Sequence, residues 1–181
     1  MPFTLSELNH CAISGKPLEQ QDFVVVFPVY KSHLGEPEHI CSENIALRDE
    51  FENWQYRDRV ISRVRSAWVE WYRNTKSYSI LWDHDSFLVV ESLLEDKIRI
   101  FFLNHVFAVE LIKEQWNEFQ QKTLTIREGH ILLRSNVSLF WKTYPSYTNL
   151  LIVDKEWRDT IDIPSSEWEH LMRFFSSKDR N

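Results

Sequence analysis

Two cysteines are the residues of this chain whose type and spacing most suggest metal chemistry. Cys11 is followed by Ser14 and Gly15, where a zinc-binding turn would carry a second cysteine and then a glycine. Cys41 is followed three positions later by Asn44, again where a second cysteine would stand. Structural zinc requires four Cys or His ligands in a tetrahedron. The two motifs therefore supply only half of a ligand set.

Histidines close in sequence offer one way to complete that set. His10, His33 and His39 lie near the cysteines, and a Cys2His2 variant could use His10 and His39. Neighbours such as His10 and Cys11 rarely point at one ion, however, so we expect no cofactor and keep zinc as the alternative. If zinc is bound, the candidate ligands are Cys11, Cys41 and His39. Otherwise both thiols pack as small apolar side chains, and a disulfide between them is less expected in a reducing compartment.

The spacing over residues 10–55 resembles the skeleton of a treble-clef zinc finger. That fold runs from a C-x-x-C-G turn through a hairpin into a helix whose first turn supplies the last ligands. The resemblance implies a loop-rich N-terminal subdomain, and it extends to HNH-type nucleases, which are built on the same skeleton. Their catalytic histidine precedes the proline of a motif similar to H-x-x-P, and here Val25 takes that place in "VVFP". Without that base no water would be activated, so the resemblance argues against nuclease activity.

Strands and helices must position these residues, and the hydrophobic periodicity of the sequence predicts an α+β fold. Residues 22–30 form a continuous apolar run typical of a buried strand that ends near Pro28. A helix is expected to begin with Ser42 as its cap, and a longer helix to cover residues 57–75. After residue 76 the apolar period changes to that of strands.

The second half predicts an antiparallel sheet with helices packed on one face. Two strands flank a hairpin turn at residues 83–85, and residues 109–120 show a helical apolar face. A strand is expected at residues 123–127, and further strands follow it. The last helix should begin at a capping box, since Ser166 and Glu169 have the required spacing.

We expect two parts that form one compact unit. Residues 1–76 would make the N-terminal subdomain, with its degenerate metal motif, a strand and two helices. Residues 77–181 would make the sheet with its helices. No internal repeat is visible in the sequence.

Composition limits the classes of partner. The net charge is −6, which disfavours non-specific binding to nucleic acid or anionic membrane and suits a basic protein partner. Aromatic residues make up 14% of the chain, with 8 tryptophans, so an aromatic contact surface is plausible. No apolar run is long enough to span a membrane, and the start shows no secretory signal. We therefore expect a cytoplasmic location and no membrane partner.

Two further groups of residues could do chemistry. His84 lies between Asp83 and Asp85, an arrangement that could bind a metal or transfer a proton, although turns commonly collect these residue types. The helix at residues 57–75 carries a row of arginines that could bind phosphate, although acidic residues interleave with it. The row consists of Arg57, Arg59, Arg63, Arg65 and Arg73.

The end of the chain, "WRDTIDIPSSEWEHLMRFF", together with the strands before it, resembles PC4-like single-strand DNA-binding modules. Those modules also run a strand into a helix that carries a tryptophan. Aromatic side chains on a sheet can stack bases while cations contact phosphates. The candidates are the aromatic residues Tyr78, Phe140, Trp141, Tyr144 and Tyr147 and the basic residues Arg127, Arg134, Lys142 and Arg158.

Together these observations favour a non-catalytic protein-binding protein. Its form would be a small acidic inhibitor of the immunity-protein type or an accessory subunit, with a basic protein as partner. The alternative is a nucleic-acid-binding regulator that binds single strands through the C-terminal sheet. A second alternative is an enzyme with an unrecognised site, for which His84, Asp83 and His105 would be the residues to examine. No nucleotide-binding, hydrolase or metalloprotease motif is present.

Overall fold

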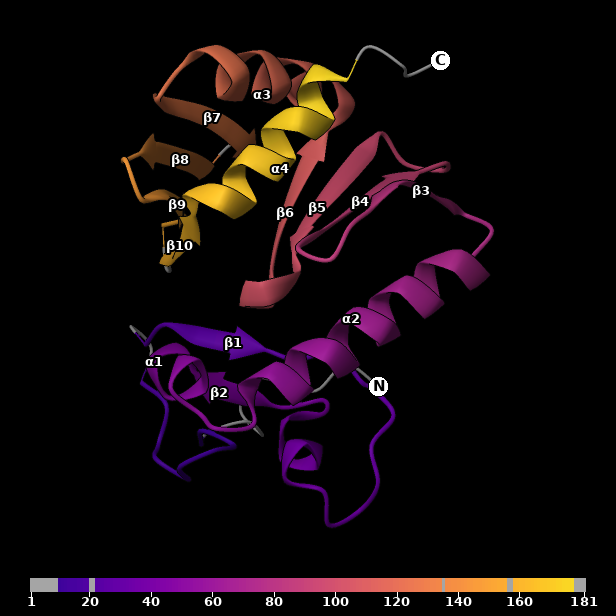
Figure 1. The fold of residues 1–181 in the computed structure, drawn as a ribbon, viewed down its shortest axis with the longest axis vertical. Helices are drawn as coiled ribbons and strands as arrows, with labels where there is room; N and C mark the ends of the chain where they lie inside the picture. The colour runs from indigo at the N-terminus through magenta and orange to yellow at the C-terminus, as the bar shows by residue number, and fades with distance from the viewer. Residues whose placement is uncertain (1–9, 20–21, 135, 156–157, 178–181) are drawn as a thin grey trace.

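The computed structural model of the chain describes residues 10–19, 22–134, 136–155 and 158–177. Figure 1 shows a small N-terminal part and a larger body, with helix α2 (Arg57–Asn74) running along the junction between them. These residues form four α-helices and three antiparallel sheets, so the predicted α+β class is confirmed. Among the described residues, no helix is both long enough and apolar enough to cross a bilayer.

The N-terminal part is built on a short hairpin. Strand β1 (Val24–Val26) pairs antiparallel with β2 (Ile45–Leu47), a 3-10 helix η2 (Pro37–Cys41) lies between them, and α1 (Arg48–Glu52) follows directly.

Two predictions for the N-terminal part are wrong in detail. The apolar run at residues 22–30 contributes only three residues to a strand, because its partner β2 is equally short. The helix expected to begin at Ser42 begins at Arg48, since residues 45–47 are used in strand pairing. Ser42 instead ends the 3-10 helix and accepts a hydrogen bond from the backbone N–H of Tyr30.

The body contains the same order of elements twice: four strands that form an antiparallel meander, then a helix. The first set is β3 (Tyr78–Asp83), β4 (Phe87–Ser92), β5 (Lys97–Phe102), β6 (Phe107–Ile112) and α3 (Lys113–Thr125). The second set is β7 (Glu128–Arg134), β8 (Val137–Thr143), β9 (Tyr147–Val153), β10 (Arg158–Pro164) and α4 (Ser165–Ser176). Corresponding strands begin 50 or 51 residues apart, and both helices carry a tryptophan at their fourth position, Trp116 and Trp168.

The sequence pattern does not reveal this repeat, because it repeats the order of elements with little identity of residues. The one predicted sheet is accordingly two four-stranded sheets, in the orders β3-β4-β5-β6 and β10-β9-β8-β7. The predicted change from helix to strand near residue 76 falls in the short connection between α2 and β3.

Helix boundaries in the body also differ from the predictions. Residues 109–112 were expected to be helical but complete β6, where Leu111 pairs with Ile98 and faces the core. Helix α3 then continues to Thr125, so no separate strand forms at residues 123–127. Helix α4 forms, but its N-cap is Pro164 and no side-chain cap hydrogen bond is present there, so the capping box expected at its start does not form.

One large core fills the body. It lies between the inner faces of the two sheets and helices α3 and α4, and both repeated tryptophans belong to it. A separate apolar cluster lies on the outer face of the first sheet, where Val69 and Tyr72 of α2 pack against Leu88, Val90 and Phe101. Strand β4 is therefore buried on both faces.

Candidate functional site

The turn that carries Cys11 is closed by a carboxylate. The Cys11 thiol donates to Glu50 Oε2 over 3.0 Å, and Lys16 Nζ lies 2.6 Å from Glu50 Oε1. Hydrogen bonds from Lys16, Ser14 and Cys11 lower the pKa of Glu50 to about 2. Glu50 lies on α1, so this thiol–carboxylate–ammonium contact, called here the Glu50 clasp, ties residues 11–16 to the first helix.

The second cysteine has the properties of a core residue. Cys41 is fully buried in the same apolar cluster as Cys11, and both thiols are free. Burial, with a smaller contribution from Cys11, raises the pKa of the Cys41 thiol to about 12, so it is protonated at neutral pH. His39 Nδ1 instead lies 2.8 Å from Ser32 Oγ. Among the described residues, no group of three or more His, Cys, Asp or Glu side chains could hold a metal ion, so Cys11, Cys41 and His39 are not assembled as ligands.

The acidic turn at residues 83–85 docks helix α2 onto the first sheet. Asp83 forms ion pairs with Arg65, over 3.0 Å, and with Arg73. The His84 ring stacks on Trp82, with ring centroids 5.1 Å apart. These contacts give the turn a structural role.

The arginine row of α2 is neutralised by carboxylates of other elements. Arg59 Nη2 lies 2.9 Å from Glu38 Oε1, and Arg63 Nη2 lies 3.4 Å from Glu36 Oε2. Glu38 is fully buried, so its charge requires these arginines. The row therefore joins α2 to η2, which weakens the prediction of a phosphate-binding face.

A buried polar network joins the N-terminal part to both sheets. Arg48 of α1 donates to the carbonyl oxygen of His105 over 3.0 Å and to Asp159 Oδ2 over 3.1 Å. His105 lies in η3 (Leu103–His105), and its Nε2 is 3.6 Å from Glu167 Oε2. Burial by itself would raise the pKa of Glu167, but the nearby His105 ring and a hydrogen bond of 3.0 Å from Asn104 lower it. The charged groups of this network are therefore explained by a structural role, the connection of α1 to η3 and β10.

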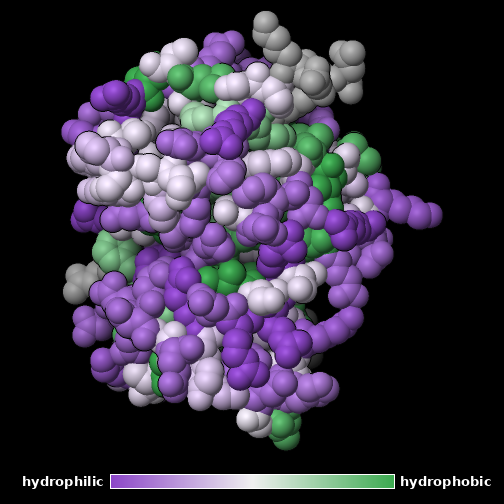
Figure 2. All heavy atoms as spheres, in the orientation of Figure 1, coloured by the Kyte–Doolittle hydropathy of each residue, from purple (hydrophilic) through white to green (hydrophobic). Residues whose placement is uncertain are grey.

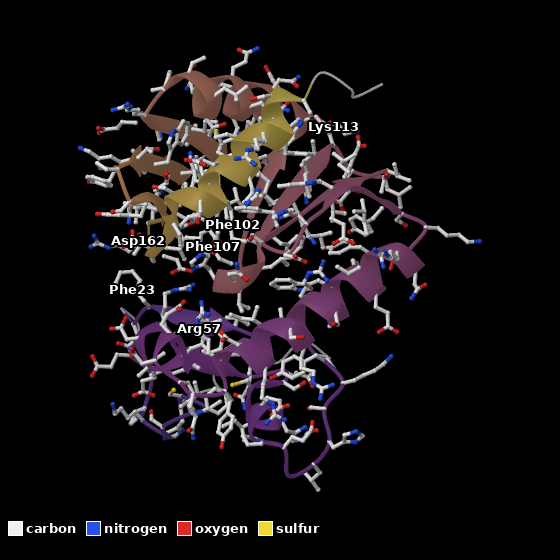
Figure 3. The ribbon with its side chains drawn as sticks, in the orientation of Figure 1. Phe23, Arg57, Phe102, Phe107, Lys113 and Asp162 are labelled. Atoms are coloured by element: carbon white, nitrogen blue, oxygen red, sulfur yellow. The ribbon has the colours of Figure 1, made fainter. Side chains whose placement is uncertain are left out.

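Beside the network a cleft of about 370 Å³ opens between the N-terminal part and β10. Asp49, Glu52 and Asp162 line it, while the guanidinium of Arg48 is already engaged by Asp159. We call this region the acidic cleft. Figure 3 shows Phe23, another lining residue, and Asp162 at the same edge of the molecule, one from each part. Of His84, Asp83 and His105, only His105 lines this cleft, so the three enzyme candidates do not share it.

A groove of about 870 Å³ lies between α2 and the segment Pro28–Lys31. Its α2 side combines small residues, Ser62, Ser66 and Ala67, with the ring of Trp71, which is 50% exposed. We call it the α2 groove. Figure 2 shows that the face in view is mainly hydrophilic, with hydrophobic residues only in small groups.

The aromatic residues proposed for single-strand binding do not form one surface. Trp141 is buried beneath Gly129, and Tyr78 packs against Tyr72 in the cluster under α2. On the second sheet Phe140 remains exposed and stacks on His130, with ring centroids 4.5 Å apart.

The cations of that surface are only partly available. Lys142 lies 3.2 Å from Glu128, while Arg127 and Arg158 are exposed. The side chain of Arg134 lies outside the described structure. Tyr144 and Tyr147 stack on each other at the end of the same sheet, with centroids 4.7 Å apart.

Comparison with protein-family models, with curated proteins and with solved structures gives no match for this chain. The treble-clef and PC4-like resemblances therefore stay predictions. The α2 groove was not anticipated from the sequence. The sequence signal for it was the pair Trp68 and Trp71 on α2, of which the structure leaves the Trp71 ring half-exposed.

Proposed function

We propose that this protein binds another protein without catalysing a reaction, and that an apolar segment of the partner lies in the α2 groove. The observation that carries the proposal is the half-exposed ring of Trp71 beside a floor of small side chains. Large rings exposed next to a cavity are typical anchors of protein interfaces. Val29 on the opposite wall is 64% exposed, so apolar surface is available on both sides.

The rim of the groove carries a charge of each sign. Lys31 and Glu70 form an ion pair of 2.9 Å that connects the segment at residues 28–31 with α2. Both side chains are exposed, so this pair contributes little to stability and can exchange for contacts with a partner. A partner segment with apolar side chains and flanking charges of either sign would satisfy the groove.

The net charge of −6 supports a basic partner, because an acidic surface accelerates encounter with a basic one. This combination is typical of a small acidic inhibitor of the immunity-protein type or of an accessory subunit. Single-strand binding through the second sheet is the weaker alternative, since Lys142 is engaged by Glu128 and Asp162 adds negative charge nearby.

Peptide display tests the groove directly. Random peptides are selected on the wild-type protein alone, and their affinities are then measured on Ser66→Arg, which fills the groove floor from an exposed helix position. Gln121→Arg, an equal change of charge on an exposed position of α3, is the matched control. We expect apolar peptides that bind wild type and Gln121→Arg equally and bind Ser66→Arg at least about tenfold more weakly. Peptides that bind all three proteins equally would remove the groove as the binding site.

A further inference from the structure

The repeat in the body leaves one sheet face without the cover that its counterpart has. On the first sheet, α2 packs across the outer face and buries Leu88, Val90 and Phe101. On the second sheet, the side chains of the corresponding face stay exposed or half-buried. Leu132 is 51% exposed and Phe140 is 39% exposed. Within the described residues, no helix packs across the second sheet as α2 packs across the first (Figure 1).

Strand register arranges this outer face into rows. One row runs from His130 through Phe140 and Leu151 to Thr160, because these residues are cross-strand partners. The row on one side of it places Leu132, Ser138, Val153 and Arg158 opposite one another. Phe140 and Leu151 are direct partners, Val153 follows Leu151 on the same face of β9, and Leu132 lies diagonally from Phe140. These apolar side chains form a patch, called here the open face. Its apolar residues are Leu132, Phe140, Leu151 and Val153.

The third row is charged and leads to the acidic cleft. It consists of Glu128, Lys142, Asn149 and Asp162. Asn149 lines both a depression beside Phe140 and the acidic cleft, so the two hollows lie side by side. A ligand that covers the open face therefore meets the carboxylates of Asp162 and Asp49 at one end, while Glu52, which also lines the cleft, is paired with Arg57 over 2.7 Å.

We propose that the open face binds an amphipathic helix of a partner protein, with basic side chains at the end that reaches the acidic cleft. The equivalent face of the first sheet is covered by a helix, α2, which packs Val69 and Tyr72 against it. By analogy, a helix is the occupant that suits the open face. An amphipathic helix presents apolar side chains at intervals of three and four residues, which matches a compact apolar patch. The charge of the cleft determines the direction of the helix and its basic end.

This inference shares with the proposed function only the class of partner, a protein. The α2 groove takes no part in it. The open face lies on β7–β10 and the groove on α2, so variants of one leave the other intact.

A model helix tests the open face. The probe is the fluorescein-labelled peptide LKKLLKLLKKLLKL, and its acidic counterpart LEELLELLEELLEL controls for charge. Fluorescence anisotropy is measured at near-physiological salt with wild type, with the face variants Phe140→Ser and Leu151→Ser, and with the cleft variant Asp162→Asn. Leu94→Ser is the matched apolar control, because Leu94 is 80% exposed on the β4–β5 turn, and Asp96→Asn is the matched acidic control. Hydrogen exchange of β7–β10 gives a second readout that needs no substitution.

We expect the basic helix to bind wild type at least about tenfold more tightly than the acidic one. Each face variant should weaken binding at least about fivefold and Asp162→Asn about two- to threefold, with no effect from either control. The basic helix should also slow exchange in β7–β10.

Three outcomes would overturn the inference. The first is equal binding by all variants, and the second is no protection of β7–β10. The third is tight binding of a labelled oligothymidine that Phe140→Ser abolishes, which would assign the face to single-stranded nucleic acid. Ser66→Arg should bind the helix as wild type does, so loss of peptide binding at the groove and loss of helix binding here are distinguishable.

Discussion

The Glu50 clasp predicts a specific dependence of stability on pH. The pKa of Glu50 is about 2, against an ordinary value of 4.5. One pKa unit is equivalent to about 1.4 kcal/mol, so the shift sets an upper bound of about 3 kcal/mol. The Glu50 side chain is 19% exposed and Lys16 is largely exposed, so solvent screening reduces the expected contribution to about 1–2 kcal/mol.

The sign follows from the direction of the shift. A carboxyl whose pKa is lower in the folded state stabilises the fold above its unfolded pKa and loses that contribution as pH falls through its folded pKa. Glu50→Gln cannot ionise, so it should lower the free energy of unfolding by about 1–2 kcal/mol at pH 7. The difference from wild type should shrink between pH 4.5 and pH 2.

Urea denaturation at pH 7 and at pH 3, followed by circular dichroism, measures this difference. Glu70→Gln is the matched control, because Glu70 forms an exposed ion pair with Lys31 and should change the free energy of unfolding by less than about 0.5 kcal/mol. If Glu50→Gln and wild type show the same pH dependence, the clasp does not hold the turn at residues 11–16 to α1 and the reasoning is wrong.

Three further predictions concern stability and metal content. Gly129→Ala should lower the free energy of unfolding by about 1–3 kcal/mol in urea denaturation, because the added Cβ would overlap the Trp141 ring; an unchanged midpoint would show that the ring can move. Arg48→Met should lower it by about 2–4 kcal/mol in the same assay, since Asp159 loses its cation at the junction; a neutral effect would mean that apolar packing compensates. Protein purified without chelator should contain far less than one zinc per chain by elemental analysis, and chelator should leave the thermal midpoint unchanged. One equivalent of zinc would instead require ligands that the described residues do not assemble.

Local sequence was sufficient where an element is stabilised mainly by its own pattern. Residues 57–75 were predicted as a helix and form α2, because apolar side chains recur at helical spacing over five turns. The hairpin around residues 83–85 was predicted from turn residues between two apolar runs, and β3 pairs with β4 there.

The prediction of secondary structure failed where the same residues fit both the helical and the strand periodicity. Ile112 and Trp116 lie four residues apart, a spacing compatible with one helical face, yet Ile112 belongs to β6 because it pairs with Lys97 of β5. Ser42 suits a helix N-cap, but residues 45–47 pair with β1 as a strand, so the helix begins only after them. Pairing partners elsewhere in the chain decide such cases, and the periodicity of the segment itself does not contain them.

The sequence by itself determined the acidic charge, the surplus of rings, the α+β class and the incomplete metal motif, because composition and short-range periodicity are properties of the chain. Only the tertiary structure decided which rings remain in contact with solvent. Trp141 and Phe140 are neighbours in sequence, yet alternation along β8 buries the first and exposes the second. Helix α2 covers one of two equivalent sheets, and this choice depends on packing between segments that are distant along the chain.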